Sequence, residues 1–310
     1  MNFFEQFIDR FHVPVEALPI IEKLVRPDEI FFVAVLEKES FTLDGAVDAL
    51  RKSTGENPTN AQAERYLRSA YQRGVLSLED ETFTRYRIGE FDTRLDIFAT
   101  TERESYRAFP SEFRAAVDRW YFDKYLSRLD DSPCPTGDKI VPLQEALDYV
   151  DTIERQIWFQ NCDCRPLAEH CDKPIDTCIS FRSGINTMAH RGLSKPITKE
   201  EAKDVIRRAN KAGLMQTLNN DGMCNCCGDC CYLFRAQKAR NYGLAWPATQ
   251  QIAEFHDEAC ISCRRCVKRC NFDAFTFEND SIRFSPDLCR GCALCAQTCP
   301  TGAITMGRRL

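Results

Sequence analysis

The stretch CISCRRCVKRCNFDAF, residues 260–275, places four cysteines within eleven positions and decides how the end of this chain folds. These cysteines follow the spacing C-x2-C-x2-C-x3-C, and the same spacing returns 29 residues later in CRGCALCAQTCPTGAIT, residues 289–305. Three thiolates two residues apart on one tight loop can reach three irons of a cubane, and a fourth thiolate can come from the other half. The repeat therefore predicts a pair of iron–sulfur sites.

Cysteine is the anomaly in an otherwise ordinary composition. The chain has 310 residues, 44% of them apolar, which is enough to build a real core. It contains 18 cysteines, and 17 of them lie between Cys162 and Cys299. The first residues, MNFFEQFIDRF, include acidic side chains and no basic segment, so no secretory signal is visible. In a chain of this length without an export signal, such density indicates metal binding rather than disulfides, and the cytoplasm is the expected compartment.

Residues 250–310 resemble the two-cluster bacterial-type ferredoxin family, whose signature is this cysteine spacing followed by proline. The resemblance implies two short hairpins with two short helices, and AFTFE, SIRFS and GAITM have the pattern of the strands. It also implies two [4Fe–4S] clusters, with the fourth cysteine of each run serving the other cluster. One cluster would be held by Cys260, Cys263, Cys266 and Cys299. The other would be held by Cys289, Cys292, Cys295 and Cys270. Zinc ribbons need paired C-x2-C knuckles and longer loops, which this spacing does not provide.

Two features distinguish the first cysteine run from the second. Asn271 stands where Pro300 stands in the other half, and a polar neighbour near the sulfurs is expected to shift the potential of that cluster. The run also carries positive charge, which would favour the reduced cluster or form a docking patch for an acidic redox partner. Ordinary surface charge is the alternative, since residues 250–310 hold eight basic and seven acidic side chains. The basic residues are Arg264, Arg265, Lys268 and Arg269.

Nine further cysteines form a middle module in NCDCRPLAEHCDKPIDTC (161–178) and CNCCGDCC (224–231). They are sufficient for two cubanes, or for one cubane and a structural metal, with zinc or free thiols as alternatives. Adjacent cysteines suit two neighbouring sites, or one ligand beside a spectator, because their side chains diverge. The CCG at 226–228 resembles the cysteine-rich domains of heterodisulfide-reductase-type enzymes, and the whole pattern resembles cysteine-rich iron–sulfur proteins of anaerobes. The nine are Cys162, Cys164, Cys171, Cys178, Cys224, Cys226, Cys227, Cys230 and Cys231.

The middle cysteines are expected to lie on loops held by helices. Val141–Phe159 predicts a helix that runs into an extended piece. Thr198 and Glu201 form a capping box for a helix with an apolar stripe that ends at Gly213. Cys134 stands alone in SPCPTG and is expected to be a spectator. Of the four histidines, only His170 and His190 are near the middle cysteines in sequence.

The first 130 residues contain no cysteine, which indicates a separate domain. Two amphipathic helices are predicted at 42–54 and 59–76, followed by strands at 82–89 and 93–100. This arrangement resembles a winged helix. The region holds 18 basic and 24 acidic residues, which disfavours DNA binding through phosphate contacts and favours protein docking. The aromatic segment 105–129 is expected to form a core helix.

Together these patterns predict an α+β protein in three parts: a winged-helix-like docking domain (1–130), a cysteine-rich helical and loop module (131–249) and a ferredoxin domain (250–310). The predicted function is the relay of single electrons between [4Fe–4S] clusters, one or two of them in the middle module, and a flavin- or metal-containing oxidoreductase partner. Neither nucleic acid nor a membrane span is expected, since the net charge is −5 and the longest apolar run is Ile30–Leu36. Two alternatives stay open: a redox-sensing transcriptional regulator, and an oxidoreductase with a catalytic cluster in the middle module.

Overall fold

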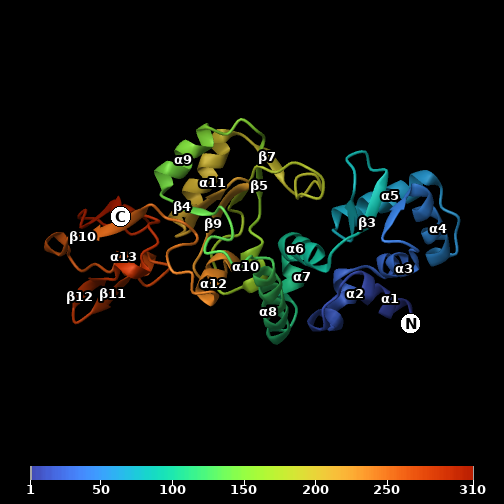
Figure 1. The fold of residues 1–310 in the computed structure, drawn as a ribbon, viewed down its shortest axis with the longest axis horizontal. Coiled ribbons are helices and arrows are strands. Elements are labelled where there is room, and N and C mark those ends of the chain that lie inside the picture. Colours follow the sequence, from blue (N-terminus) through green and yellow to red (C-terminus); the bar gives the residue numbers. More distant parts are fainter. Residues whose placement is uncertain (1, 310) are drawn as a thin grey trace. The chain divides into compact units, whose positions relative to one another are not determined.

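The computed structural model describes residues 2–309 and divides the chain into two compact units (Figure 1). The first unit comprises the residues up to Tyr121 together with Ser183–Lys195, and the second comprises Phe122–Arg182 and the residues from Pro196 onward. The segment Ser183–Lys195 belongs to the first unit, although the residues before and after it in the sequence belong to the second. In the first unit, the side-chain amide of Asn186 pairs with both backbone groups of Leu78, at 2.8 and 2.9 Å.

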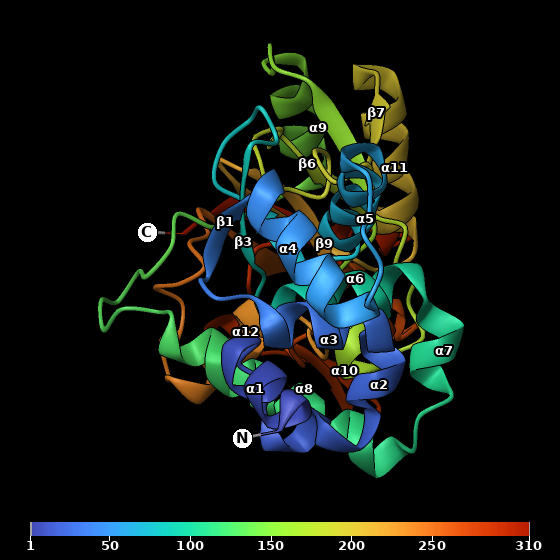
Figure 2. The ribbon, with the colours of Figure 1, turned by 90° about the vertical axis from the view of Figure 1, so that its right-hand side faces the viewer.

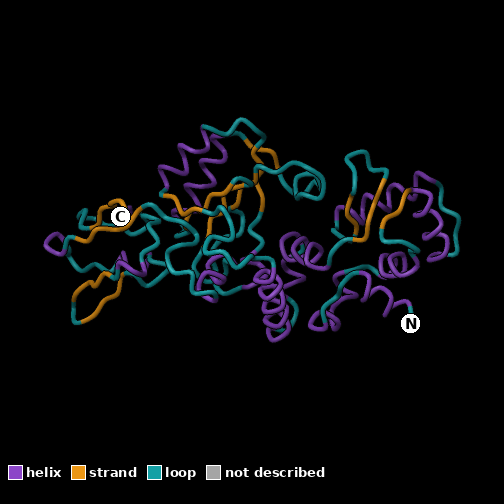
Figure 3. The backbone as a smooth tube through the Cα atoms, in the orientation of Figure 1, coloured by secondary structure: helices purple, strands orange, loops and turns teal. Residues whose placement is uncertain are grey.

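The first unit is mainly helical, and its elements are distinguished by colour in Figure 3. They are α1 (Phe3–Arg10), η1 (Val15–Ile20), α2 (Ile21–Leu24), α3 (Pro27–Val35), β1 (Ser40–Thr42), α4 (Leu43–Thr54), α5 (Asn60–Gln72), β2 (Leu76–Leu78), β3 (Arg85–Ile88), α6 (Phe91–Thr101), α7 (Arg103–Arg107) and α8 (Ser111–Ser127), which continues into the second unit. The strands form an antiparallel sheet in the order β1-β3-β2.

The two predicted N-terminal helices are present as α4 and α5. Thr59 and Gln62 cap α5 reciprocally, and the chain turns away beyond it at Gly74, whose φ is +81°. The strand predicted at 93–100 is wrong, because these residues form α6. Leu95, Ile97, Phe98 and Ala99 are all buried there, so helix packing on several sides overrides the strand preference of the β-branched and aromatic residues. The aromatic segment 105–129 is divided between α7 and α8.

The second unit contains the remaining elements. They are β4 (Lys139–Val141), α9 (Leu143–Asp151), β5 (Ile157–Gln160), α10 (Cys164–Ala168), β6 (Cys178–Ser180), β7 (Lys195–Ile197), α11 (Lys199–Lys211), β8 (Met215–Asn219), β9 (Gly222–Cys226), α12 (Tyr232–Ala239), β10 (Gln251–Phe255), η2 (Asp257–Ala259), α13 (Arg265–Arg269), β11 (Phe275–Glu278), β12 (Ser281–Phe284), η3 (Pro286–Leu288), η4 (Ala296–Thr298) and β13 (Ile304–Arg308). Among the described residues, no helix has the length and apolar character needed to cross a membrane.

A six-stranded sheet organises the middle module, in the order β4-β8-β9-β6-β5-β7. The expectation of a helical and loop module is therefore wrong. Cys178 begins β6, whereas Cys224 and Cys226 lie on β9. These strands are only three to five residues long and pair with partners far away in sequence. No local sequence pattern therefore predicts them.

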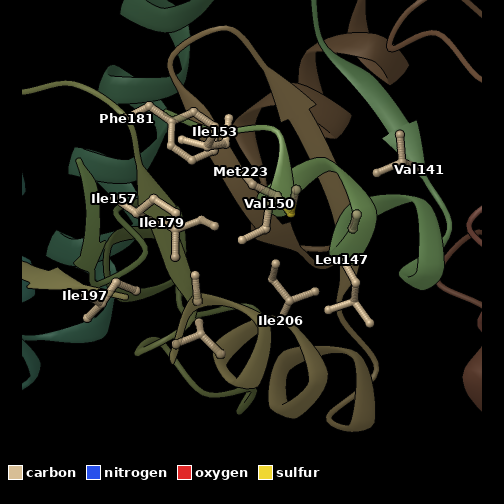
Figure 4. Packing of buried hydrophobic residues seen from close by; sticks show 13 residues of the cluster. Val141, Leu147, Val150, Ile153, Ile157, Ile179, Phe181, Ile197, Ile206 and Met223 are labelled. Atoms are coloured by element: carbon tan, nitrogen blue, oxygen red, sulfur yellow. The ribbon is translucent and has the colours of Figure 1, made fainter. Parts of the chain in front are cut away.

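Helices α9 and α11 lie side by side (Figures 1 and 2) and cover one face of this sheet. Figure 4 shows Leu147 and Val150 of α9 and Ile206 of α11 gathered with Ile179 and Met223 of the strands. Side chains alternate between the faces of a strand, so Cys224 and Cys226 point away from the face of Met223, and Cys178 away from that of Ile179. The helix-covered face forms the apolar core, and the opposite face carries thiols.

The C-terminal residues form two antiparallel ribbons, β10 with β13 and β11 with β12. The three strands predicted there are present as β11, β12 and β13. The cysteines lie in the loops and short helices between the ribbons.

Candidate metal centres

The two C-terminal cysteine loops share one backbone conformation. Ser262 and Gly291 occupy equivalent positions, 29 residues apart, and both have positive φ, at 51° and 65°. Arg264 and Ala293 are likewise equivalent, at 61° and 62°. Glycine is required at 291, because a Cβ there would lie 2.3 Å from the carbonyl oxygen of Gln251. Each loop therefore curls in the same way.

The structure brings together the two sets of four cysteines that the sequence pairs. Cys299 lines the same small pocket as Cys260, Cys263 and Cys266. In the other half, burial and the neighbouring thiols of Cys292, Cys289 and Cys270 together raise the pKa of Cys295. The fourth cysteine of each run thus crosses to the other loop.

Backbone N–H groups point at these sulfurs. The N–H of Ser262 donates to Cys260 Sγ at 3.4 Å, and the N–H groups of Ala253 and Gly291 donate to Cys289 Sγ at 3.4 and 3.5 Å. Burial raises the pKa of Cys292 to about 12. Burial also acts to raise the pKa of Cys299, but donors from Thr301 and the following backbone outweigh it and leave that pKa lowered. Four convergent thiols with such donors fit a [4Fe–4S] cluster in each set.

Comparison with known proteins agrees with this geometry. The family model of the 4Fe-4S dicluster domain matches residues 253–306. Pyruvate synthase subunit PorD of Thermotoga maritima is 40% identical over 70 residues, which are 22% of this chain and 69% of that protein. The PorD of Methanocaldococcus jannaschii is 36% identical over 70 residues, covering 79% of its own length. The chain belongs to the 4Fe-4S dicluster family. Its dicluster domain carries two [4Fe–4S] clusters and transfers electrons.

The dicluster match covers only the end of the chain. Indolepyruvate oxidoreductase subunit IorA of Pyrococcus horikoshii is 35% identical over 75 residues, which are 24% of this chain and only 11% of IorA. The chain thus spans about a tenth of the length of that relative. No solved structure matches the chain. These relatives are named as subunits of pyruvate synthase and of indolepyruvate oxidoreductase, which supports electron transfer rather than the regulator alternative.

The dicluster domain packs against the middle module through the residue that breaks its internal repeat. The side chain of Asn271 accepts a hydrogen bond from Lys173 Nζ at 2.7 Å and donates to the carbonyl of Gly213 at 3.1 Å. Its carbonyl lies so close to Gly228 that a Cβ there would approach it to 2.3 Å. Beside it, the ring of Phe272 meets that of Phe234, with centroids 5.0 Å apart. Asn271 therefore stands in place of proline because its side chain makes hydrogen bonds between the dicluster domain and the middle module.

The four basic residues of the first run have different surroundings. Arg269 donates to the carbonyl of Lys211 at 2.7 Å and to that of Asn210, at the end of α11, where a cation complements the helix dipole. Arg264 lies over the ring of Phe277, 3.5 Å from its centroid. Arg264, Arg265 and Lys268 are exposed. Thus Arg269 joins the dicluster domain to the middle module, and the other three remain on the surface.

The nine middle cysteines divide into six and three. Six thiols line one cavity, and each perturbs the pKa of two others in a closed order, which we call the ring; for one neighbouring pair, Cys231 and Cys226, the sulfurs are 3.4 Å apart. Two cubanes, one of the arrangements that the sequence leaves open, would instead require two groups of four. The order around the ring is Cys162, Cys164, Cys231, Cys226, Cys224 and Cys178.

The other three cysteines, Cys171, Cys227 and Cys230, form a compact trio. Their sulfurs all lie within 4.8 Å of one another, and the Cys230 and Cys171 sulfurs are 3.5 Å apart. Among the residues that the structure describes, this is the only group of three Cys, His, Asp or Glu residues as close as this. Cys226 and Cys227 are adjacent in sequence yet belong to different groups, as expected for neighbouring side chains that diverge.

A buried polar network supports the ring. Arg165 is 2% exposed, and its guanidinium donates to the carbonyls of Pro174 and Asn225, each at 2.8 Å, and to Thr177 Oγ1. The Asn225 side chain accepts a hydrogen bond from Gln216 at 3.0 Å. These contacts fix α10, β6, β8 and β9 relative to one another. None of these residues was predicted from the sequence to have a role, although an arginine directly after C-x-C was the available signal.

Of the remaining candidates, Cys134 and His190 lie apart from these groups, whereas His170 lies beside the trio. Cys134 is exposed, and its thiol donates to the carbonyl of Ala245 at 3.2 Å. His190 belongs to the first unit, where its ring contacts the hydroxyl of Tyr71 at 2.8 Å. The ring of His170 lies 3.2 Å from the carbonyl of Asp229.

Proposed function

We propose that this protein relays single electrons between an oxidoreductase partner and thiolate-bound metal sites in its own middle module, with the dicluster domain as the connection. When bound, the [4Fe–4S] clusters supply reversible one-electron chemistry. The chain supplies their spacing, burial and charge. Cys260, Cys263, Cys266 and Cys299 hold the outer cluster. Cys289, Cys292, Cys295 and Cys270 hold the inner one.

This proposal rests on the closeness of three groups of thiols within the second unit: the ring, the trio and the inner cluster set. Cys226 of the ring is followed by Cys227 of the trio, and then by Gly228, whose backbone touches Asn271. Asn271 directly follows Cys270 of the inner cluster set. The three hydrogen bonds and the aromatic contact around Asn271 hold this succession together. One or two metal sites in the middle module, most simply iron–sulfur clusters, would thus lie next to the inner cluster.

The outer cluster set has the features of a contact point for a partner protein. Cys263 is exposed, and the neighbouring Ile261 is 64% exposed, so an apolar side chain lies on the surface beside a cluster ligand. Arg264, Arg265 and Lys268 surround it with positive charge. An acidic patch on a redox partner would complement this surface, which favours rapid encounter.

The first unit is proposed as a docking domain of the winged-helix type. The order of α3, β1, α4, α5, β2 and β3, with the sheet order β1-β3-β2, supports this assignment. DNA binding is disfavoured because two arginines of the second predicted helix, Arg68 and Arg73, are engaged within the unit. Arg68 lies over the ring of Phe83, and Arg73 donates to Glu29 and to the carbonyl of Leu24, at 3.0 and 3.1 Å.

The test is the reduction of the full chain, purified without oxygen, by a reduced acidic flavoprotein. A protein-sized donor cannot enter the middle-module cavity, which has a volume of about 200 Å³. We expect the metal sites of the middle module to be reduced after the dicluster clusters in rapid-freeze EPR. In the variant C289S/C292S their reduction should slow at least tenfold, whereas C134S should behave as the wild type. Equal rates in the wild type and C289S/C292S would refute the relay.

A further inference from the structure

We infer that the six-thiol ring holds one polynuclear iron–sulfur cluster with more than four irons, separate from the site of the trio. The ring is defined by Cys162, Cys164, Cys231, Cys226, Cys224 and Cys178. This inference rests on the proposed iron–sulfur loading of the middle module and adds the number of sites and the size of one cluster.

The closed order of contacts is the first observation. All six thiols line the same cavity and each acts on both its neighbours in a closed order, so no four of them stand apart as the ligands of a cubane. A cubane takes one thiolate on each of its four irons. Two thiols would then remain beside it without a metal, although Cys162, Cys178, Cys226 and Cys231 are all buried. Six converging thiolates instead match a cluster with more than four irons.

The charge of the site is the second observation. The charged side chains that line the ring cavity are one arginine and two aspartates, namely Arg165, Asp138 and Asp163. Arg165 alone cannot compensate six thiolates, and buried charge without a partner is strongly unfavourable. Several metal cations are required to bring these sulfurs together as thiolates. The 3.4 Å between Cys226 and Cys231 is far longer than a disulfide bond of about 2.05 Å, so the ring is not a set of disulfides.

The cavity is the third observation, and it favours iron with sulfide over zinc alone. A space of about 200 Å³ opens beside the ring, lined in addition by Tyr125, Asn161 and Asn219. Two zinc ions held between contacting thiolates, at about 2.3 Å from each sulfur, would fill the ring without using this space. Bridging sulfides and further irons need room beyond the thiolates. The Thr217 hydroxyl, 3.1 Å from Cys226 Sγ, is positioned to stabilise a cluster thiolate from the side.

The strands explain why the ring is one site. Cys178, Cys224 and Cys226 lie on one face of the adjacent strands β6 and β9, opposite the helix-covered core. Cys164 begins α10, and Cys231 precedes α12. Rigid elements thus present thiols from both cysteine-rich segments to one centre, whereas the trio lies beside Ala209 and Leu214 in a different cluster of buried residues.

The test compares substitutions on opposite sides of the ring. Iron, acid-labile sulfide and zinc per chain are measured in anaerobically prepared full chain, together with Mössbauer spectra. Two [4Fe–4S] clusters account for about eight irons. In the trio variant C171S/C227S/C230S, we expect more than about twelve irons. Because Cys162 and Cys226 are opposite in the ring, C162S and C226S should each remove the same set of more than four irons.

The controls make each outcome decisive. C134S should retain all iron, and the ring variants should retain at least the roughly eight irons of the dicluster domain with unchanged dicluster EPR signals, which shows that the chain still folds. One cubane in the ring would give about twelve irons in the trio variant and overturn the inference. Two zinc ions, or losses that differ between C162S and C226S, would also overturn it. None of these outcomes depends on electron transfer, so failure of the relay would be recognised separately.

Discussion

The contact between Gly228 and Asn271 allows the joint between the middle module and the dicluster domain to be tested by one methyl group. A Cβ added at 228 would lie 2.3 Å from the carbonyl oxygen of Asn271 and 3.2 Å from its Cβ. Real Cβ atoms essentially never approach within 3.0 Å, so the two segments must separate by about 0.7 Å. The opposing atom belongs to the backbone, so a rotamer change cannot relieve the contact.

We expect Gly228→Ala to destabilise the second unit by about 1–3 kcal/mol, which is the usual cost of overpacking. For a unit of this size the melting temperature should fall by roughly 2–12 °C. Gly137→Ala is the matched control, because nothing lies within 4 Å of a Cβ at that position and neither glycine has a positive φ. Thermal unfolding of the metal-loaded full chain, followed by circular dichroism under anaerobic conditions, measures both variants.

A melting temperature for Gly228→Ala equal to that of Gly137→Ala would refute the close packing at this joint. A lowered melting temperature with unchanged electron transfer between the inner cluster and the middle module would refute the assignment of this contact to the relay. The iron content of both variants is measured in parallel, because Gly228 lies between Cys227 and Cys230.

Three further predictions follow from the geometry. Asn271→Pro, which copies the other half of the repeat, removes the bonds to Lys173 and Gly213 and should cost about 2 kcal/mol in urea unfolding, whereas the reciprocal Pro300→Asn should cost less than half as much. Thr198→Ala removes the cap of α11 and should cost about 1 kcal/mol; no change would contradict the capping box. Because burial raises the pKa of Cys292 to about 12, its thiol is protonated at neutral pH, and metal must displace that proton. Cobalt(II) uptake by the metal-free chain, followed by thiolate absorbance, should therefore strengthen as pH rises from 6 to 8.5, and pH-independent uptake would contradict this.

The cluster loops and the helices could be predicted because they depend on residues that are close together in the sequence. The spacing of Cys260, Cys263 and Cys266 describes a loop directly, and its repetition shows which distant cysteine completes each set. The helices α4, α5 and α11 were predicted for the same reason, because their caps and apolar stripes are local.

The features that escaped prediction depend on contacts between distant residues. The six-stranded sheet joins β6 to β9 across more than forty positions, through strands too short to show alternation. The sequence indicated that the adjacent Cys226 and Cys227 suit neighbouring sites, but which other cysteines join each of them depends on that sheet. The return of Ser183–Lys195 to the first unit depends on contacts such as that of Asn186 with Leu78, which no periodicity encodes.

The unequal exposure of the two dicluster sets has a consequence for the behaviour of the protein in air. Cys263 of the outer set is exposed, whereas Cys289 and Cys295 of the inner set are buried and Cys292 is only partly accessible. Dioxygen would reach the outer iron first and destroy that cube while the inner centres survive. Briefly aerated protein would then keep most of its colour and yet accept no electrons from its partner, so loss of activity would precede bleaching.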